Sequence, residues 1–427
     1  MKAVQDIIAQ HKAGRGVGIY SACSAHPLVI EAALSHARLK RASVLIEATS
    51  NQVNQDGGYT GMRPADFNRF VLSIAARVGV PPSQVLLGGD HLGPNCWQAL
   101  PAEAAMVKSE QLIADYVAAG FRKIHLDCSM SCADEPISLV DAVVAARAVR
   151  LCAVAERTWA RVGGEAPVYV VGTEVPVPGG AHEELDELAL TDAAAASATI
   201  DAHRQAFRSA GLEPVWPRVI GLVVQPGVEF DHDKVIDFRA SRAGALAAVA
   251  EAQPHLVYEA HSTDYQTPAN LRALVQKHFA ILKVGPGLTF AMREALWALD
   301  DIEREWLGTD RSSGLRQSVQ KAMTAAPQFW NKYYLSKGRQ LELDLQYSRS
   351  DRIRYYWPVP EVDSALQRLL ANLDANPPPL SLVSQYLPLQ YQAIREGRLG
   401  LRARELVMHA VEQVLQQYAE ACTDHAR

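Results

Sequence analysis

The stretch Val85-Leu-Leu-Gly-Gly-Asp-His-Leu-Gly-Pro94 says most about the fold of this chain. An apolar, strand-like run ends there in two polar residues, Asp90 and His91, followed by a turn-forming Gly-Pro pair. The stretch Leu256-Val-Tyr-Glu-Ala-His-Ser-Thr-Asp264 repeats the arrangement and carries His261 at its tip. Two buried strands with polar carboxyl ends predict a parallel sheet in which distant strand ends share one site.

Apolar runs of this kind recur eight times in the first two-thirds of the chain, at 17–22, 43–49, 85–89, 123–128, 168–172, 219–224, 256–260 and 279–284. Each run is short, nearly continuous and often β-branched, as is typical of parallel strands covered on both faces. Segments with apolar residues every three or four positions separate them, such as 64–78, 102–119 and 139–156. The alternation predicts an α/β fold, a closed (β/α)8 TIM barrel.

The pattern becomes purely helical after residue 288, with amphipathic segments at 289–306, 314–325 and 402–418. A barrel takes about 250 residues, and this chain has 427. We therefore predict a barrel over residues 1–295 that carries the site, and an α-helical C-terminal extension over residues 296–427 packed on the barrel.

Composition excludes several classes of protein. A formal net charge of −5 with scattered Lys and Arg gives no basic face for nucleic acid. The N-terminal residues do not resemble a signal peptide, and no apolar run is long enough to cross a membrane, so we expect a cytoplasmic protein. Six dispersed cysteines predict reduced thiols. Dinucleotide and P-loop fingerprints and a serine-hydrolase elbow are missing.

The predicted strand ends are rich in acids, amides and imidazoles. His91 and His261, joined by Gln225 or Glu174, have the ligand types that suit a divalent metal ion such as Zn²⁺, Mn²⁺ or Mg²⁺. The alternative is that the histidines only hydrogen-bond inside the barrel mouth. Asp90 is the first candidate for proton transfer, and its alternative role is to orient a neighbour. Further candidate catalytic acids are Glu47, Asp127 and Glu174.

A phosphate site is predicted after the last two strands, where barrels often bind phosphate with backbone amides and a helix N-terminus. The residues concerned are Ser262, Thr263, Lys283 and Gly285. Asn51 and Asn54, after the second strand, offer amide donors for sugar hydroxyls or phosphate, although this signal is weak. Residues 176–190 form a long connection that is either a lid over the site or a solvated acidic turn.

Several of these stretches together resemble one known family. They are Cys23-Ser-Ala-His-Pro27, Ile46-Glu-Ala-Thr-Ser-Asn-Gln-Val-Asn54, Gly88-Gly-Asp-His-Leu-Gly-Pro-Asn95, Gly172-Thr-Glu-Val-Pro-Val-Pro-Gly-Gly180, Val224-Gln-Pro-Gly-Val-Glu-Phe-Asp-His232, Tyr258-Glu-Ala-His-Ser-Thr-Asp-Tyr-Gln266 and Asp351-Arg-Ile-Arg-Tyr-Tyr-Trp-Pro358. The family is that of the so-called non-catalytic subunit of class II D-tagatose-1,6-bisphosphate aldolase. The resemblance spans nearly the whole chain.

This family in turn resembles the metal-dependent class II aldolases. The resemblance implies that Asp90 and His91 match their base and metal ligand, that His261 matches a later histidine, and that Lys283 begins a similar stretch. Gln225 stands where those aldolases have a further metal histidine, which puts ordinary zinc affinity and aldolase activity in doubt.

Similar proteins are described either as stabilising partners of a separate aldolase chain or as D-tagatose 6-phosphate 4-epimerases. An older description as a kinase lacks support, because no nucleotide cradle is visible. Carbon 4 of a 2-ketose cannot be inverted by simple enolisation, since its hydrogen is not adjacent to the carbonyl. A retro-aldol break between carbons 3 and 4 followed by reclosure would invert it, given a cation, a base and a phosphate anchor.

The first functional hypothesis is thus a sugar-phosphate epimerase that forms D-fructose 6-phosphate in galactitol and tagatose catabolism. The alternative is an accessory protein that stabilises the catalytic subunit of a class II tagatose-bisphosphate aldolase. The expected partners are accordingly a sugar phosphate and, in the second case, that catalytic subunit. A homo-oligomer is also compatible with the sequence.

Overall fold

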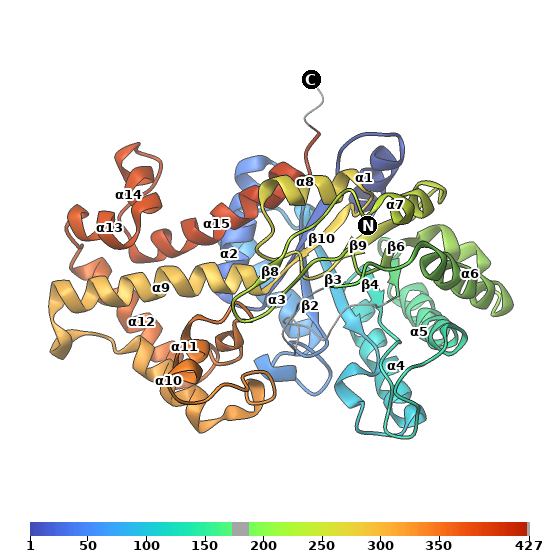
Figure 1. Ribbon diagram of the computed structural model, residues 1–427, viewed down its shortest axis with the longest axis horizontal. Helices are drawn as coiled ribbons and strands as arrows, with labels where there is room; N and C mark the ends of the chain where they lie inside the picture. Colours follow the sequence, from blue (N-terminus) through green and yellow to red (C-terminus); the bar gives the residue numbers. More distant parts are fainter. Residues whose placement is uncertain (173–187, 425–427) are drawn as a thin grey trace.

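Eight parallel strands close into a barrel in the order β1-β10-β9-β6-β5-β4-β3-β2. The computed structural model describes residues 1–172 and 188–424 (Figure 1). The barrel strands are β1 (Ile19–Cys23), β2 (Val44–Thr49), β3 (Val85–Leu92), β4 (Lys123–Leu126), β5 (Val168–Val171), β6 (Val219–Val223), β9 (Val257–Ala260) and β10 (Ile281–Val284). The predicted TIM barrel is confirmed. The main difference in boundaries is that β3 runs on to Leu92, because the strand continues through a bulge.

A short antiparallel hairpin that the sequence did not predict, β7 (Glu229–Phe230) and β8 (Val235–Ile236), lies in the connection between β6 and β9. The helices within the barrel part of the chain are α1 (Lys2–Lys12), α2 (Pro27–Lys40), α3 (Pro64–Val78), α4 (Ala102–Ala118), α5 (Asp141–Val162), α6 (Ala193–Ser209), α7 (Gly244–Glu251) and α8 (Pro268–Gln276). Local chemistry sets several of their starts. For example, α8 begins with proline at its first position and Thr267 as N-cap, whose side chain accepts from the amide of Asn270.

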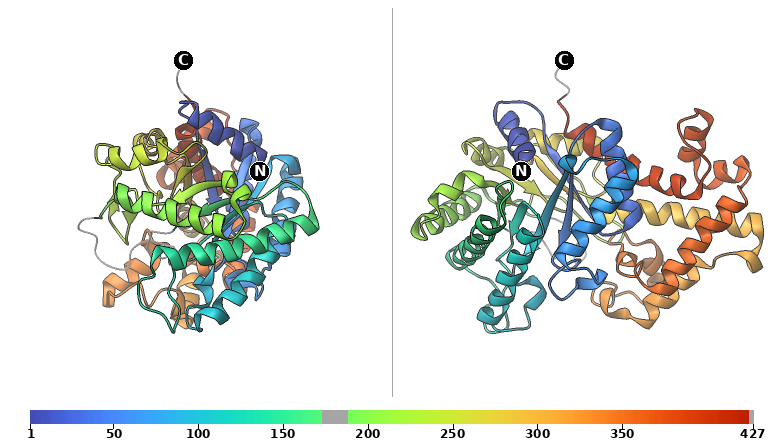
Figure 2. Two further views of the ribbon diagram at one scale, coloured as in Figure 1. Left: turned by 90° about the vertical axis from the view of Figure 1, so that its right-hand side faces the viewer. Right: turned by 180° about the vertical axis from the view of Figure 1, so that it is seen from behind.

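The helices that follow the barrel are α9 (Pro286–Leu307), α10 (Leu315–Ala325), α11 (Gly338–Tyr347), α12 (Pro360–Ala375), α13 (Leu380–Tyr386), α14 (Pro388–Arg395) and α15 (Ala403–Ala421). Most of them gather on one side of the barrel (Figures 1 and 2). Helix α13 follows three consecutive prolines at 377–379. Among the described residues, no helix combines the length and the apolar character that crossing a bilayer would require.

The last helix, α15, completes the ring of helices around the barrel. It packs against both α2 and α8, in the position where the helix after the eighth strand normally lies, while α9 extends outward from the barrel. Buried Leu406, Val407 and Leu415 belong to the same hydrophobic core as the barrel helices. Residue 295 falls inside α9, so the division of the chain at that point stays a prediction.

Helix α1 closes the opposite, amino-terminal end of the barrel. Its side chains Val4 and Ile8 are buried in a separate apolar cluster with the first residues of the strands, including Ile19, Leu45 and Ile281. Because apolar side chains fill that end of the barrel, a polar site can open only at the carboxyl ends of the strands.

Candidate active site

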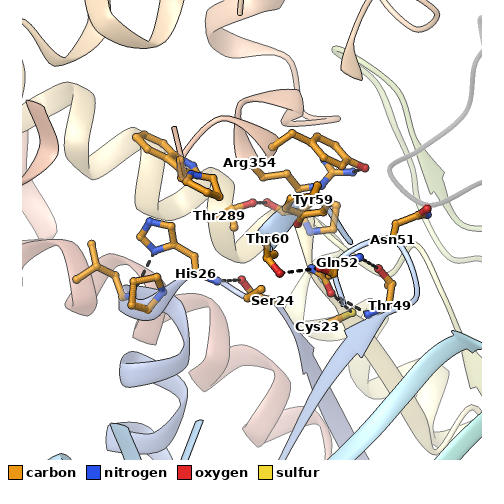
Figure 3. Close-up of a pocket in the computed structure, with 18 of the residues that line it drawn as sticks. Cys23, Ser24, His26, Thr49, Asn51, Gln52, Tyr59, Thr60, Thr289 and Arg354 are labelled. Carbon is orange, nitrogen blue, oxygen red and sulfur yellow. Dashed lines mark hydrogen bonds between the residues drawn. The ribbon is translucent and has the colours of Figure 1, made fainter. Parts of the chain in front are cut away.

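A cavity of about 500 Å³ opens at the carboxyl ends of the barrel strands. Strand ends supply Cys23, Thr49, Asp90, His91, His261 and Lys283, and the helical extension supplies Arg354, Tyr355 and Trp357. Figure 3 shows Arg354 beside Tyr59 and Thr60, with Cys23 and Thr49 below them at the ends of their strands. The cavity therefore has a floor from the barrel and a wall from the extension.

Three imidazoles meet at the floor. The ring centroids of His91 and His261 lie 5.0 Å apart, those of His91 and His125 5.2 Å, and those of His125 and His261 5.4 Å. All three side chains are buried. The structure thus brings together the two histidines singled out in the sequence and adds a third, His125.

A bulge in β3 turns two consecutive residues toward the site. Neighbours in a regular strand point to opposite faces, but here the register with β4 shifts between Gly89 and Leu92, and His91 has a φ of 49°. As a result, Asp90 hydrogen-bonds to His125 at 2.8 Å, and His91 Nδ1 lies 2.7 Å from Asp127 Oδ2.

An ion network lies inside the barrel next to the imidazoles. Lys123 Nζ lies 2.7 Å from Glu47 Oε1 and 2.6 Å from Glu259 Oε2. Lys283 Nζ lies 2.8 Å from Asp90 Oδ2 and also pairs with Glu47. Gly88 makes room for this network, because a Cβ at that position would lie 2.4 Å from Glu47 Oε1.

Burial and the neighbouring charges set the protonation of the site. Burial lowers the pKa of His261 to about 4, although Glu259 opposes the shift, so its ring is neutral at neutral pH. Glu259 Oε1 lies 2.9 Å from His261 Nε2, which places the proton on Nε2 and leaves a lone pair on Nδ1.

His125 is in the opposite state. Its closest partners, Asp90 Oδ1 at 2.8 Å and the carbonyl oxygen of Gly172 at 3.0 Å, both accept hydrogen bonds. Burial opposes its charged form, but the hydrogen bond and charge of Asp90 raise the pKa of His125 above its ordinary value. Burial likewise disfavours ionised Asp90, yet the charges of His91 and Lys283 hold its pKa well below the ordinary value.

The donor set fits a divalent metal ion. Asp90, His125, Glu259 and His261 each offer one ligand atom, and these atoms lie within 4.8 Å of one another. Nitrogen and oxygen donors of this kind suit Zn²⁺ or Mn²⁺. The carboxylates Glu47, Asp90, Asp127 and Glu259 outnumber the ammonium groups of Lys123 and Lys283, so the site carries excess negative charge that favours a bound cation.

This group shares only His261 with the ligand set expected from the sequence. Gln225 is committed elsewhere, because its Oε1 accepts from the amides of Gly227 and Val228. Glu174 lies outside the described residues, as does most of the predicted lid at 176–190. His91 keeps the geometry typical of a metal-binding histidine, with Nδ1 on the carboxylate of Asp127 and its other nitrogen 3.7 Å from Asp90.

The predicted phosphate loop is already filled by a side chain of the protein. Asp264 Oδ1 accepts from the amide of Gly285 at 2.9 Å and from that of Gly287 at 2.7 Å, at the start of α9. Thr263 donates to the carbonyl oxygen of Lys283, and the Lys283 ammonium is held in the ion network. These donors are therefore not free for phosphate, which corrects the expectation for Thr263, Lys283 and Gly285.

The other predicted ligand-binding residues divide into two groups. Asn54 holds its own loop, since its Oδ1 accepts from the amides of Asp56 and Gly58. Asn51 and Ser262 line the cavity. Of the predicted acids, Asp90 lines the cavity, whereas Glu47 and Asp127 are fully buried behind it.

Lys123, His125 and Glu259 were not assigned a role from the sequence, although a signal for them exists. Lys123 and His125 alternate with apolar residues in β4, Asp127 follows directly at the same spacing of two, and Glu259 and His261 repeat this spacing at the end of β9. That period places all of them on one face of their strands, which in a closed barrel is the interior.

Comparison with known proteins agrees with this architecture. The family described as D-tagatose-1,6-bisphosphate aldolase subunit GatZ/KbaZ-like matches residues 4–423. A crystal structure described as a probable tagatose 6 phosphate kinase from Sinorhizobium meliloti 1021 has 50% sequence identity and a TM-score of 0.88. The match covers 95% of this chain and 100% of that chain.

More remote similarities are found to two other structures. Fructuronate-tagaturonate epimerase UxaE from Cohnella laeviribosi has 11% identity and a TM-score of 0.48, over 96% of this chain and 82% of that chain. The YdjI aldolase from Escherichia coli K12 has 12% identity and a TM-score of 0.41, over 83% and 95%. The match to the family over nearly the whole length is what decides: the chain belongs to the GatZ/KbaZ-like family of D-tagatose-1,6-bisphosphate aldolase subunits.

Proposed function

We propose that this protein is a D-tagatose 6-phosphate 4-epimerase that forms D-fructose 6-phosphate. The observation that carries the proposal is the placement of Asp90, an ionised carboxylate at the cavity floor, between the cations Lys283 and His125. Such a group can accept a proton from a sugar hydroxyl, while the neighbouring cations stabilise negative charge that develops on substrate oxygens.

The reaction is a reversible carbon–carbon cleavage. The 4-hydroxyl loses its proton, the bond between carbons 3 and 4 breaks, and the electron pair moves onto the carbonyl at carbon 2 as an enediolate. The aldehyde half turns, the bond reforms on its other face, and the new 4-oxygen takes the proton back. No oxidant or co-substrate is needed, in keeping with the absence of a dinucleotide fingerprint.

In this proposal Asp90 moves the proton, and Lys283 stabilises the charge from the cavity floor. Glu47 and Glu259 hold the two lysines in place and do not touch the substrate. A divalent cation held by Asp90, His125, Glu259 and His261 would supply a Lewis acid for substrate oxygens; His125 would then release a ring proton to become a neutral ligand, and the ion would provide the positive charge beside Asp90.

Turnover by the isolated chain tests the proposal. Purified protein is incubated with D-tagatose 6-phosphate and Mn²⁺, Mg²⁺, Zn²⁺ or a chelator, and D-fructose 6-phosphate is measured with a coupling enzyme. We expect turnover by the wild type, loss of turnover in Asp90→Asn, and retained turnover in Asp363→Asn. Asp363 is the matched control, because it lines the same cavity as an exposed carboxylate on α12. Absence of turnover with every ion would refute the proposal.

A second candidate function follows from the family itself, whose description is that of an aldolase subunit. In that case the chain would stabilise a class II aldolase without doing chemistry. Co-expression with such an aldolase distinguishes the two functions. An accessory subunit should raise the activity or heat resistance of its partner even when it carries the Asp90→Asn substitution. We do not propose a kinase, because the sequence contains no phosphate loop for a nucleotide.

A further inference from the structure

A phosphorylated substrate needs an anion site other than the loop after β10. Asp264 already occupies the amides of Gly285 and Gly287, and it is buried there. A phosphate bound to the same two amides would have to displace the Asp264 carboxylate, and the negative charges of the two groups would repel each other. The anchor must therefore lie elsewhere in the cavity.

Arg354 is a cation in the cavity wall that forms no direct ion pair with a carboxylate of the described residues, although the charges of Asp351 and Asp264 act on it from a greater distance. It comes from the 3-10 turn Arg352–Tyr355 in the extension, and within residues 1–172 and 188–424 no acidic oxygen lies within 4.0 Å of its guanidinium. Its Nη1 donates to the carbonyl oxygens of Ser350 and Asp351, and its Nη2 to the hydroxyl of Tyr355. No described residue accepts from its Nε, so part of the guanidinium fork remains available.

The position of Arg354 is fixed by contacts on several sides. The Thr289 hydroxyl of α9 donates to Asp351 at 2.5 Å, which ties the turn to the barrel. The guanidinium carbon lies 4.7 Å from the ring centroid of Tyr355, and that ring lies 4.6 Å from the ring of Tyr59. A guanidinium held in this way is preorganised for charge-assisted hydrogen bonds to an anionic ligand group.

Arg404 provides an internal comparison. It lines the same cavity, but its Nε lies 3.2 Å from Glu31 Oε1 and its Nη2 pairs with Glu31 Oε2. The guanidinium of Arg404 is thus held by a carboxylate of α2, which it shares with Arg77. Of these two arginines, Arg354 is the one whose guanidinium has no ion pair with a carboxylate of the described residues.

We propose that Arg354 binds the phosphate of the sugar substrate and makes the site specific for phosphorylated ketoses. The inference rests on the proposed function, and it places the reacting carbons toward Asp90 and the phosphate toward the extension. Cleavage between carbons 3 and 4 leaves the phosphate on the aldehyde half. Arg354 holds that half in the cavity while its carbonyl turns to present the other face.

Phosphate binding can be measured without turnover. The full-length wild type, Arg354→Gln, Arg354→Lys and Arg404→Gln are titrated with inorganic phosphate by calorimetry. We expect affinity to fall by about 10-fold or more in Arg354→Gln, since hydrogen bonds to charged groups contribute about 1.5–3 kcal/mol. Arg354→Lys should retain part of the affinity, because it keeps the charge, and Arg404→Gln should bind within about twofold of wild type.

The kinetic comparison uses D-tagatose 6-phosphate and unphosphorylated D-tagatose. Arg354→Gln should lower kcat/KM for the phosphate ester and leave that for the free sugar unchanged. Equal phosphate affinity in wild type and Arg354→Gln would overturn the inference, as would an equal loss in Arg404→Gln. Phosphate binding that depends on Arg354 in a chain without turnover would support the anion site and refute the epimerase.

Discussion

Removal of Lys123 tests the ion network on which the site is built. The change Lys123→Met keeps the length and apolar stem of the side chain but deletes the ammonium group. The side chains of Lys123, Glu47 and Glu259 are all 0% exposed, and the nitrogen lies within 2.7 Å of a carboxylate oxygen of each acid. Lys283 still pairs with Glu47, so Glu259 is the acid that loses its ammonium partner.

Removing one partner of a buried ion pair costs about 3–5 kcal/mol, because an uncompensated charge remains. We expect a loss of that size in the free energy of unfolding near pH 7. Burial disfavours ionised Glu259, but chiefly Lys123 holds its pKa below the ordinary value. The stability that ionised Glu259 contributes in the wild type is present above the unfolded-state pKa and is lost at lower pH. In the variant, Glu259 has lost its ammonium partner, so burial should raise its pKa above the unfolded-state value and it should take up a proton as the pH falls. The cost of the unpaired charge is relieved in this way, and the difference between variant and wild type should narrow as the pH falls toward about 4.5.

Urea unfolding followed by tryptophan fluorescence at pH 7.5 and 5.0 measures both effects. The double variant Lys123→Met/Glu259→Gln removes the stranded charge as well, and it should be more stable than the sum of the single changes by about 0.5–3 kcal/mol. Lys321→Met is the matched control. Lys321 is exposed on α10, so its substitution should change the free energy of unfolding by no more than about 0.5 kcal/mol. If the free energy of unfolding of Lys123→Met were within about 1 kcal/mol of the wild-type value, the reasoning about the network would be wrong.

Three further predictions concern the same region. Burial raises the pKa of Glu229 to about 7 from 4.5, so the folded state holds a proton that the unfolded state releases. Stability should then fall by up to about 3 kcal/mol as the pH rises from 4.5 through 7, and Glu229→Gln should abolish this slope in thermal melts at pH 5 and 8. Gly88→Ala would press a methyl group against Glu47, and we expect a loss of about 1–3 kcal/mol by urea unfolding; an unchanged midpoint would contradict the packing. His261→Ala and His91→Ala should each lower the affinity for Zn²⁺ or Mn²⁺ by about 10-fold or more, while the circular dichroism spectrum stays unchanged. Full metal affinity in either variant would show that the substituted histidine does not contribute to metal binding.

Local sequence patterns predicted the barrel strands and the polar residues at their ends. Short apolar runs that alternate with helical periodicity are sufficient for a (β/α)8 barrel, because each unit is encoded in about thirty adjacent residues. Asp90, His91 and His261 could be named in advance, because polar residues after a buried strand stand out. Their meeting within 5.0 Å follows from the closure of the barrel.

Other features depended on contacts between distant parts of the chain. The capture of the Gly285 amide by Asp264, the engagement of Gln225 in its own turn and the seating of α15 between α2 and α8 are not visible in any local pattern. The stretch at 258–266 looks equally suited to a phosphate loop or to a self-capped turn, and which group binds the backbone donors, a substrate or a side chain, is decided only by the tertiary structure.

In the regular strands β4 and β9, the sequence by itself determined which residues face into the barrel, since alternation along a strand is a property of the backbone. The bulge in β3 that turns both Asp90 and His91 toward the site breaks this alternation. Only the tertiary structure decided which of these residues become partners. Lys123, Glu47 and Glu259 lie on three different strands, and they are joined because buried charges are tolerated only when they neutralise one another. The lack of an ion pair between Arg354 and any acid of residues 1–172 and 188–424 was decided in the same way, by which side chains the fold brings close to it.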